Sequence, residues 1–360
     1  MDATNLDGVP RRRGAVNPAG ESPMRKLFVF VGALAAIAAF SASGQPPANA
    51  PTESAGEVTF LVTSDSHFAS FRNTDRNDRN KATIERMNGL PGTLWPDKLG
   101  GGAIARPRGV LVLGDLIDDG DRRDETAVQW RHFESQFGLD GTDGLLRYPV
   151  FEGWGNHDGP PIGKEKFGFS VQAKLRERNA LRKRAGRVSS VSANGLHYSW
   201  DWGGVHFVQT NLYPADRQHP KVRYSLPWHD PQGALTFLKE DLAASVGTSG
   251  RPVVVASHCG VDTDWWHPED WAEFHKAVGP YNVIAYFYGH SGTGLRKFRP
   301  AEGDKPIDCV NTGQTEKGFF ACQVTPSRLR LAYHAKKDPR AEKPEWEWKY
   351  MLDKPLGRGN

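Results

Sequence analysis

The sequence has few cysteines, little net charge and no long apolar run, and each shortage excludes a class of protein. With three cysteines in 360 residues, at most one disulfide can form within the chain. The net charge of +4 gives no indication of a nucleic-acid partner, and half of it lies in residues 1–43. The longest apolar run, Leu27–Phe40, has 14 residues, whereas a stable membrane span needs about 20. The hydrophobic content of 38% is that of an ordinary globular protein, which excludes a disordered or fibrous chain.

The beginning of the chain has the pattern of a leader followed by a linker. Arg25 and Lys26 precede the apolar run, and small residues follow it, as in export signal peptides. We therefore predict a signal peptide over residues 1–43, cleaved near Ser43, and export to the periplasm or the extracellular medium. An uncleaved membrane anchor is the alternative. Residues 44–56 are rich in Pro, Ala and Ser, which predicts a flexible linker.

The remaining pattern predicts one α/β domain over residues 57–340 and a C-terminal tail over residues 341–360. Strands buried on both faces are indicated by short runs that are apolar almost throughout, at residues 58–65, 109–115, 148–156, 251–258 and 282–290. Helical patterns cover residues 125–137, 164–184, 231–246 and 268–278. A hairpin is predicted within residues 196–214, and residues 309–334 add terminal strands. We expect a four-layer αββα sandwich of two mixed sheets with outer helices.

Two features leave alternatives open. The long, arginine-rich connection over residues 66–108 is either a lid that attracts phosphate-bearing substrates or a solvated insertion whose opposite charges cancel. Cys309 and Cys322 flank a predicted turn, so they either pair across a hairpin or remain two buried thiols. Cys259 adjoins a histidine, and we interpret it as a small buried apolar residue rather than a metal ligand.

Polar residues end each of the five predicted strands, where an apolar strand has no structural need for them. The strand ends carry Asp65 and His67, then Asp115, then Asn156 and His157, then His258, and finally His290. Because the carboxyl ends of parallel strands meet at one edge of a sheet, these side chains should share one crevice. Imidazole, carboxylate and amide oxygen together suit Mn, Fe or Zn. A two-oxygen carboxylate such as Asp115 can bridge two such ions.

The motifs D-x-H, G-D-x-x-D, G-N-H-D, a later strand-end H and a final G-H resemble the calcineurin-like metallophosphoesterases in order and spacing. The resemblance covers residues 58 to about 335. It implies a site with two divalent transition-metal ions and a small phosphoester as the substrate. The metal ligands that it implies are Asp65, His67, Asp115, Asn156, His258 and His290.

The same resemblance assigns a role to each of these positions. Asp65 and His67 would hold the first ion, Asp115 would bridge, and the other three residues would hold the second ion. His157 would stabilise the phosphoryl group or protonate the leaving oxygen, and the carboxylate of Asp118 would orient its imidazole.

The last motif departs from the family's usual G-H-x-H, because Gly292 stands where the final histidine would complete the first metal site. Three explanations remain open. The first ion is held weakly by the remaining ligands and water, or another group fills the gap, or the first site is empty. The nearest substitutes along the chain are Asp262, Asp264 and His267.

We therefore expect an exported phosphoesterase in which a hydroxide held between two metal ions attacks phosphorus in line. The rival hypothesis is a non-catalytic or one-metal relative that binds a phosphorylated or sugar ligand in a tryptophan-lined groove. The candidates for such a groove are Trp154, Trp200, Trp202, Trp228, Trp265, Trp266 and Trp271. The sequence predicts neither a nucleic-acid partner nor a stable membrane span, and it gives no indication of oligomeric state.

Overall fold

The computed structural model describes residues 56–221 and 226–357 of the chain. The predicted leader, residues 1–43, and nearly all of the predicted linker lie outside the described residues. Within the described ranges, every helix is too short or too polar to cross a membrane.

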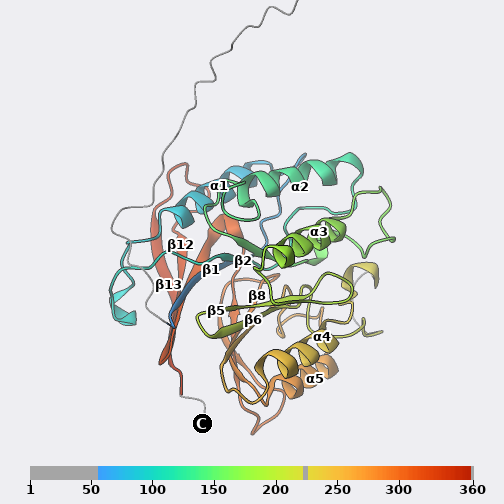
Figure 1. The fold of residues 1–360 in the computed structure, drawn as a ribbon. Coiled ribbons are helices and arrows are strands. Elements are labelled where there is room, and N and C mark those ends of the chain that lie inside the picture. The colour runs from blue at the N-terminus through green and yellow to red at the C-terminus, as the bar shows by residue number, and fades with distance from the viewer. Residues whose placement is uncertain (1–55, 222–225, 358–360) are drawn as a thin grey trace, which may run out of the picture. The chain divides into compact units, whose positions relative to one another are not determined.

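Two mixed sheets form the centre of the domain, and the predicted αββα arrangement is confirmed (Figure 1). The six-stranded sheet has the order β13-β12-β11-β1-β2-β3, and the seven-stranded sheet has the order β4-β5-β6-β7-β8-β10-β9. The first three strands pair in parallel in one sheet, and β6, β7, β8 and β10 do so in the other. The strands are β1 Val58–Thr63, β2 Val110–Val112, β3 Val150–Glu152, β4 Ser190–Val191, β5 Tyr198–Trp202, β6 Val205–Gln209, β7 Pro252–Ala256, β8 Asn282–Tyr288, β9 Gly294–Phe298, β10 Ile307–Asn311, β11 Gly318–Thr325, β12 Arg328–Lys336 and β13 Trp346–Pro355.

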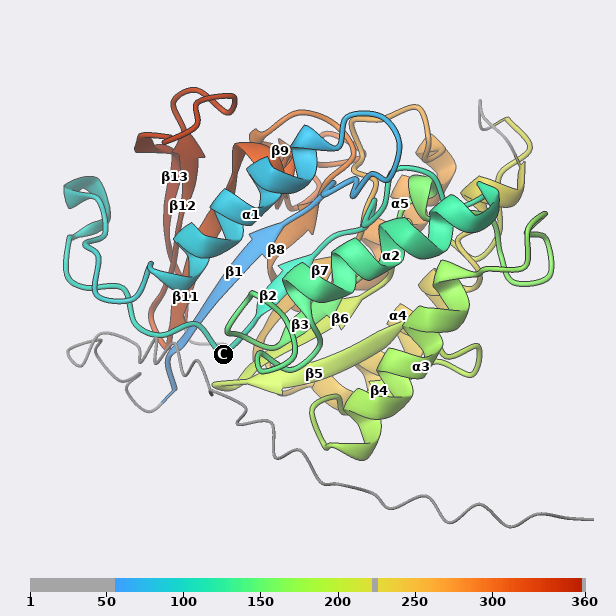
Figure 2. The same ribbon diagram turned by 90° about the horizontal axis from the view of Figure 1, so that it is seen from above.

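The helices cover the outer faces of the sheets, with α1 and α2 on one side and α4 and α5 on the other (Figures 1 and 2). The helices are α1 Asp75–Asn88, α2 Arg123–Phe137, α3 Val171–Arg184, α4 Ala234–Asp241 and α5 Pro268–Val278. Short helical turns are η1 Asp97–Leu99, η2 Asn156–Asp158, η3 Leu226–His229, the π-helical η4 Leu242–Val246, and η5 Thr315–Lys317. The predicted helix over residues 268–278 is confirmed at both ends, with Pro268 in its first turn.

Two helices begin later than the sequence pattern predicts. The helix predicted from residue 164 begins at Val171, because Gly168 has a φ of +79° and the side chain of Ser170 accepts a hydrogen bond from the main chain of Ala173. The helix predicted from residue 231 begins at Ala234, directly after Gly233 with a φ of +80°. Local backbone geometry therefore sets both starts.

The core between the sheets fixes their strands relative to one another. Phe60 of β1 contacts Phe207 of β6 and Phe287 of β8, with ring centroids 5.1 and 6.0 Å apart, and all three side chains are fully buried. Each such side chain contributes about 1.5–3 kcal/mol by leaving water. The packing of these rings thus holds the carboxyl ends of β1 and β8 in position relative to each other.

Residues 346–355 form the edge strand β13 of the six-stranded sheet, whereas the sequence pattern assigns them to a tail. They pair with β12, and the ring of His334 lies 5.1 Å from that of Trp346 and 4.1 Å from that of Trp348. Because the strand is charged and half exposed, its sequence does not show the apolar alternation typical of a strand. Its hydrogen bonds with β12 hold it in the sheet.

All three cysteines are buried free thiols. Cys309 lies in β10 and Cys322 in β11, and these strands belong to different sheets. The sequence left open whether these two cysteines form a disulfide or remain thiols, and in the structure they are two buried thiols.

Candidate active site

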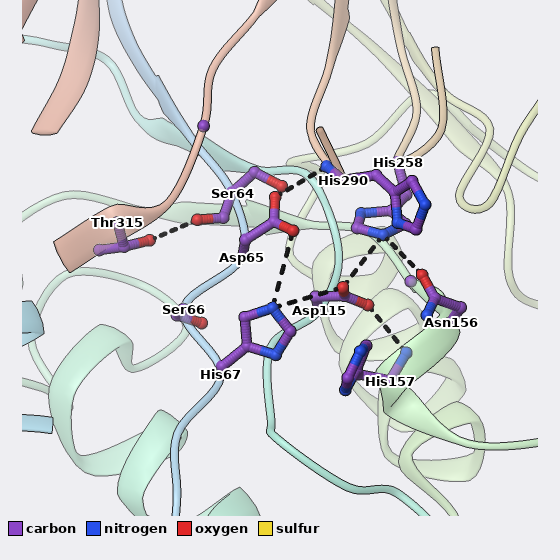
Figure 3. A network of polar contacts seen from close by, with 12 residues as sticks. Ser64, Asp65, Ser66, His67, Asp115, Asn156, His157, His258, His290 and Thr315 are labelled. Atoms are coloured by element: carbon purple, nitrogen blue, oxygen red, sulfur yellow. Dashed lines mark hydrogen bonds and ion pairs between the residues drawn. The ribbon is translucent and has the colours of Figure 1, made fainter. Parts of the chain in front are cut away.

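The carboxyl ends of five parallel strands from both sheets bring the predicted polar side chains together (Figure 3). Asp65 and His67 follow β1, and Asp115 follows β2. Asn156 and His157 lie in the short turn η2 after β3. His258 follows β7, and His290 follows β8. The candidate site therefore lies across the junction of the two sheets.

The backbone at four of these positions takes the left-handed conformation. The φ angles are 51° at Asp65, 42° at His67, 50° at Asp115 and 66° at His290. Positive φ is uncommon for residues other than glycine, and it often occurs at functional sites. After β1, β2 and β8 the chain thus turns out of the strand at a residue whose side chain enters the site.

Two glycines allow the strand ends to approach closely. A Cβ atom on Gly289 would lie 1.9 Å from Ser64 Oγ and 2.5 Å from Asp65 Oδ2. A Cβ atom on Gly155 would lie 2.3 Å from the main-chain nitrogen of Asp115. Both contacts are too short for any larger residue, which explains the glycine in the G-H and G-N-H-D motifs.

Asp115 lies at the centre of the group. Its Oδ2 atom is 3.2 Å from His258 Nε2 and 3.5 Å from His67 Nε2, and the latter atom is 3.7 Å from Asp65 Oδ1. The last two separations are too long for hydrogen bonds. They match two ligands of one ion, since ligand atoms about 2.1 Å from a tetrahedral metal lie about 3.4 Å apart. The side-chain atoms of Asp65, His67 and Asp115 are therefore placed as ligands of a metal ion rather than as hydrogen-bond partners.

His258 presents one defined nitrogen to the site. Its Nδ1 atom donates to the carbonyl oxygen of Leu113 at 2.7 Å, which leaves Nε2 facing Asn156 Oδ1 at 3.0 Å. A main-chain carbonyl commonly fixes a metal-ligating histidine in this way. The geometry suits coordination through Nε2.

The charges in the site are those that a cation requires. Burial raises the pKa of Asp115, but the neighbouring histidines outweigh it and hold that pKa well below its usual range. Burial lowers the pKa of His258, but Asp115 and Asp65 raise it to about 9. Ionised carboxylates are thus buried among imidazoles, a charge pattern that suits a bound cation.

One ring nitrogen of His157 is held by a hydrogen bond, and the other is free to face a substrate. Its main-chain N–H donates to Asp115 Oδ1 at 2.8 Å, and its Nδ1 atom donates to the main-chain carbonyl oxygen of Asp118 at 2.7 Å. The carboxylate of Asp118 lies elsewhere, 3.4 Å from Arg76 Nη1 and 3.8 Å from His67 Nδ1. The structure thus holds the imidazole by a carbonyl, whereas the sequence pattern predicts the carboxylate in that position.

A sequence model of the calcineurin-like phosphoesterases matches residues 58–293, which is more than half of the chain. The chain belongs to the calcineurin-like phosphoesterase family. Its enzyme class is accordingly that of the hydrolases acting on phosphate esters. No curated protein sequence matches the chain.

Several solved structures resemble the fold of this calcineurin-like phosphoesterase. GAP50, the anchor in the inner membrane complex of Plasmodium, is 8% identical with a TM-score of 0.45, over 81% of this chain and 88% of that one. PhoD is 13% identical with a TM-score of 0.48, over 84% and 70% of the two chains. The purple acid phosphatase PPD1 of yellow lupin is 13% identical with a TM-score of 0.49, over 83% and 55%. Because these scores are low, the family assignment rests on the sequence model alone.

A cavity of about 200 Å³ extends from Asp65, His67 and Asp115 of the candidate site toward Gly292. The substitutes that the sequence suggested for the absent histidine do not line it. Asp262 accepts a hydrogen bond from Tyr288 and pairs with Arg296 at 2.6 Å. The ring of His267 stacks on that of His219 at 3.5 Å, and its Nδ1 atom caps α5. Asp264, the remaining candidate, is not among the described residues that line the cavity.

Asp158 is a site residue for which the sequence gave a motif but no role. Its carboxylate accepts hydrogen bonds from the main-chain nitrogens of Gly155 and Leu116, both at 2.8 Å, and of Ile117 at 3.1 Å. Burial and the charge of Asp115 raise the pKa of Asp158 to about 7. The last residue of G-N-H-D therefore joins the loops after β2 and β3.

The tryptophans of the rival hypothesis do not form a groove at this site. Trp154, Trp200 and Trp266 are core residues, each 1% exposed. Among the described residues, the cavity is lined by no tryptophan, although the ring of Trp265 lies 4.7 Å from that of His290. Aromatic side chains here serve mainly to pack the core.

Proposed function

We propose that the mature chain is an exported, metal-dependent phosphoesterase that hydrolyses a phosphomonoester or phosphodiester. The observation that supports this most is the position of His67 Nε2, which lies 3.7 Å from Asp65 Oδ1 and 3.5 Å from Asp115 Oδ2, separations that suit shared metal ligands and are too long for direct hydrogen bonds. Two overlapping groups include Asp115, one with Asp65 and His258 and one with His67 and His157. The ligand atoms of each group lie within 4.8 Å of one another.

The proposed ligand sets follow from these positions. Asp65, His67 and Asp115 would hold the first ion, and Asp115 would also contact the second. The second ion would complete its shell with Asn156, His258 and His290. Mn, Fe or Zn suits such nitrogen and oxygen donors. Two such ions bound by these residues would activate water at neutral pH and offset the charge that builds on the phosphoryl oxygens.

The chain's own residues orient the substrate and move the proton. The Nδ1–H of His157 is held by the carbonyl of Asp118, so the proton that can reach the leaving oxygen is the one on Nε2. The cavity beside Gly292 has room for the phosphoryl group. With glycine at that position, the first ion would keep three protein ligands and complete its shell with water.

The test of this function is hydrolysis of 4-nitrophenyl phosphate and bis(4-nitrophenyl) phosphate by the purified mature chain. We expect activity with added Mn²⁺, loss of activity on chelation, recovery on resupply, and about two metal ions per chain. The Asp115→Asn variant, which replaces the bridging carboxylate, should lose both metal and activity. Activity that survives chelation would contradict the mechanism, and a chain without metal would favour the rival binding protein.

Export is proposed from the sequence pattern of residues 1–43 and has its own test. The N-terminus of the chain recovered from the periplasm or medium of expressing cells should begin near residue 44, as mass spectrometry would show. Recovery of the uncut chain in the membrane fraction would instead support the anchor.

A further inference from the structure

The short turn η5, Thr315–Lys317, is fixed to the end of β1, beside Asp65. Both the main-chain nitrogen and the Oγ1 atom of Thr315 donate to the carbonyl oxygen of Ser64 at 2.8 Å (Figure 3). The hydroxyl of Thr63 donates to Thr315 Oγ1 at 3.0 Å. The backbone that carries Lys317 therefore has a defined position relative to the proposed metal ligands.

The middle residue of this turn pairs with two arginines of α1, Arg76 and Arg79. Glu316 lies 2.5 Å from Arg79 Nε and 3.7 Å from Arg76 Nε, and it is buried. Arg76 also lies 3.4 Å from the carboxylate of Asp118. These two arginines are paired with carboxylates, so they are poor candidates for binding a substrate anion.

Lys317, the last residue of the turn, has an ammonium group that can bind a ligand. It lines the cavity together with Asp65, His157 and Gly292, and it is exposed. Among the described residues that line the cavity it is the one lysine or arginine, and within the described ranges its ammonium group has neither an ion pair nor a hydrogen bond. A positive charge, carried on a turn of defined position, thus borders the space beside the proposed metal centre.

We propose that Lys317 binds a phosphoryl oxygen of the substrate and makes this site prefer phosphomonoesters to phosphodiesters. The inference rests on the proposed function. At about pH 8 a monoester carries two negative charges, because its second pKa is about 6, whereas a diester carries one. A charge-assisted hydrogen bond from the ammonium group therefore stabilises the monoester more. The lysine supplies this charge on the wall where Gly292 leaves the first ion one ligand short.

The test compares three variants on both 4-nitrophenyl substrates at saturating Mn²⁺. Lys317→Met keeps the length of the side chain but removes its charge, and Lys317→Arg keeps the charge. Lys81→Met, on the exposed part of α1 beside Glu85, is the matched control. We expect Lys317→Met to lower kcat/KM for the monoester about tenfold, mainly through KM, and for the diester less than about threefold. The arginine variant should retain the monoester preference.

A binding measurement separates this inference from the proposed function. Titration of the Mn²⁺-loaded chain with inorganic phosphate should give a Kd about tenfold higher for Lys317→Met than for the wild type and Lys81→Met, whether or not the chain turns over a substrate. If the wild type hydrolyses neither ester but shows this difference, the proposed function fails and the phosphate contact stands. An unchanged phosphate Kd, or equal losses on both esters, would overturn the role of Lys317.

Discussion

The imidazole of His157 is held by the main-chain carbonyl oxygen of Asp118, 2.7 Å from Nδ1, while the carboxylate of the same residue contacts Arg76. A carbonyl at that position survives any substitution of the side chain. The histidine and the aspartate should therefore respond differently to mutation, although both belong to the motifs that resemble the family.

We predict that His157→Asn lowers kcat by about 100-fold or more, because a positioned general acid contributes about that much. Asp118→Asn should cost less than about tenfold, since the carbonyl that fixes Nδ1 is retained. Steady-state kinetics with 4-nitrophenyl phosphate would measure both. Equal losses in the two variants would show that the carboxylate, and not the carbonyl, is the effective partner.

A substitution at Gly292 should increase the affinity for metal. The φ of Gly292 is +55° and no atom lies within 4 Å of the place where a Cβ would stand, so a histidine has room, at the cost of some backbone strain. Gly292→His should lower the Mn²⁺ concentration needed for half-maximal activity by about tenfold, because even outer contacts of a metal site alter affinity by about 10- to 100-fold. The measurement is a Mn²⁺ titration of activity after chelation.

The matched control for that variant is Gly292→Ala, which has the same backbone strain but no ligand atom. It should leave the Mn²⁺ requirement unchanged. If alanine and histidine behave alike, the residue at this position does not face the first ion.

Buried Glu152 should govern stability at low pH. Burial raises its pKa, but Arg178, 2.6 Å away, and Arg182 lower it to about 2 from an ordinary 4.5. Because the folded-state pKa is the lower one, this carboxylate stabilises the fold fully above about pH 4.5, and the contribution is lost as the pH falls toward about 2. The free energy of unfolding should fall through this window, as urea titrations at several pH values would show.

Glu152→Gln should destabilise the chain by about 3–5 kcal/mol at neutral pH, because two buried guanidinium groups lose their counter-charge. Glu134→Gln is the control, since that carboxylate is 4.0 Å from Arg178 and 43% exposed, and it should cost less than about 1 kcal/mol. A similar cost for both variants would mean that the buried pair contributes no more than a surface one.

The three cysteines should be inert in the folded chain. Cys259, Cys309 and Cys322 are 0 to 2% exposed, and burial raises the pKa of each thiol above its usual range. A thiol reagent should therefore label none of them in native buffer and all three in denaturant. Fewer than three labels after unfolding without reductant would reveal a disulfide instead.

The sequence predicts most of the site because each ligand follows directly after a strand that is recognisable by itself. Asp65 and Asp115 follow apolar strands that are neighbours in one sheet, so parallel pairing gathers their ends, and His258 follows an equally recognisable strand of the other sheet. The packing of the two sheets against each other then brings His258 to the two aspartates.

The rest depends on contacts between distant parts of the chain. Strand β13 is charged, and its pairing with β12 gives it order that its own pattern does not predict. Lys317 lies 25 positions after Gly292 and reaches the same cavity because Thr315 pairs with Ser64, which no local pattern indicates. A carbonyl partner such as that of Asp118 is independent of residue type, so sequence motifs do not report it.

The main-chain nitrogen of His290 donates to Asp65 Oδ2 at 2.9 Å, joining the end of β8 in one sheet to the end of β1 in the other. Metal ions held by residues from both sheets would strengthen the same junction. The candidate site is therefore also a cross-link between the two halves of the sandwich. Removal of the ions should reduce the cooperativity of unfolding as well as the midpoint, because each sheet could then open without the other.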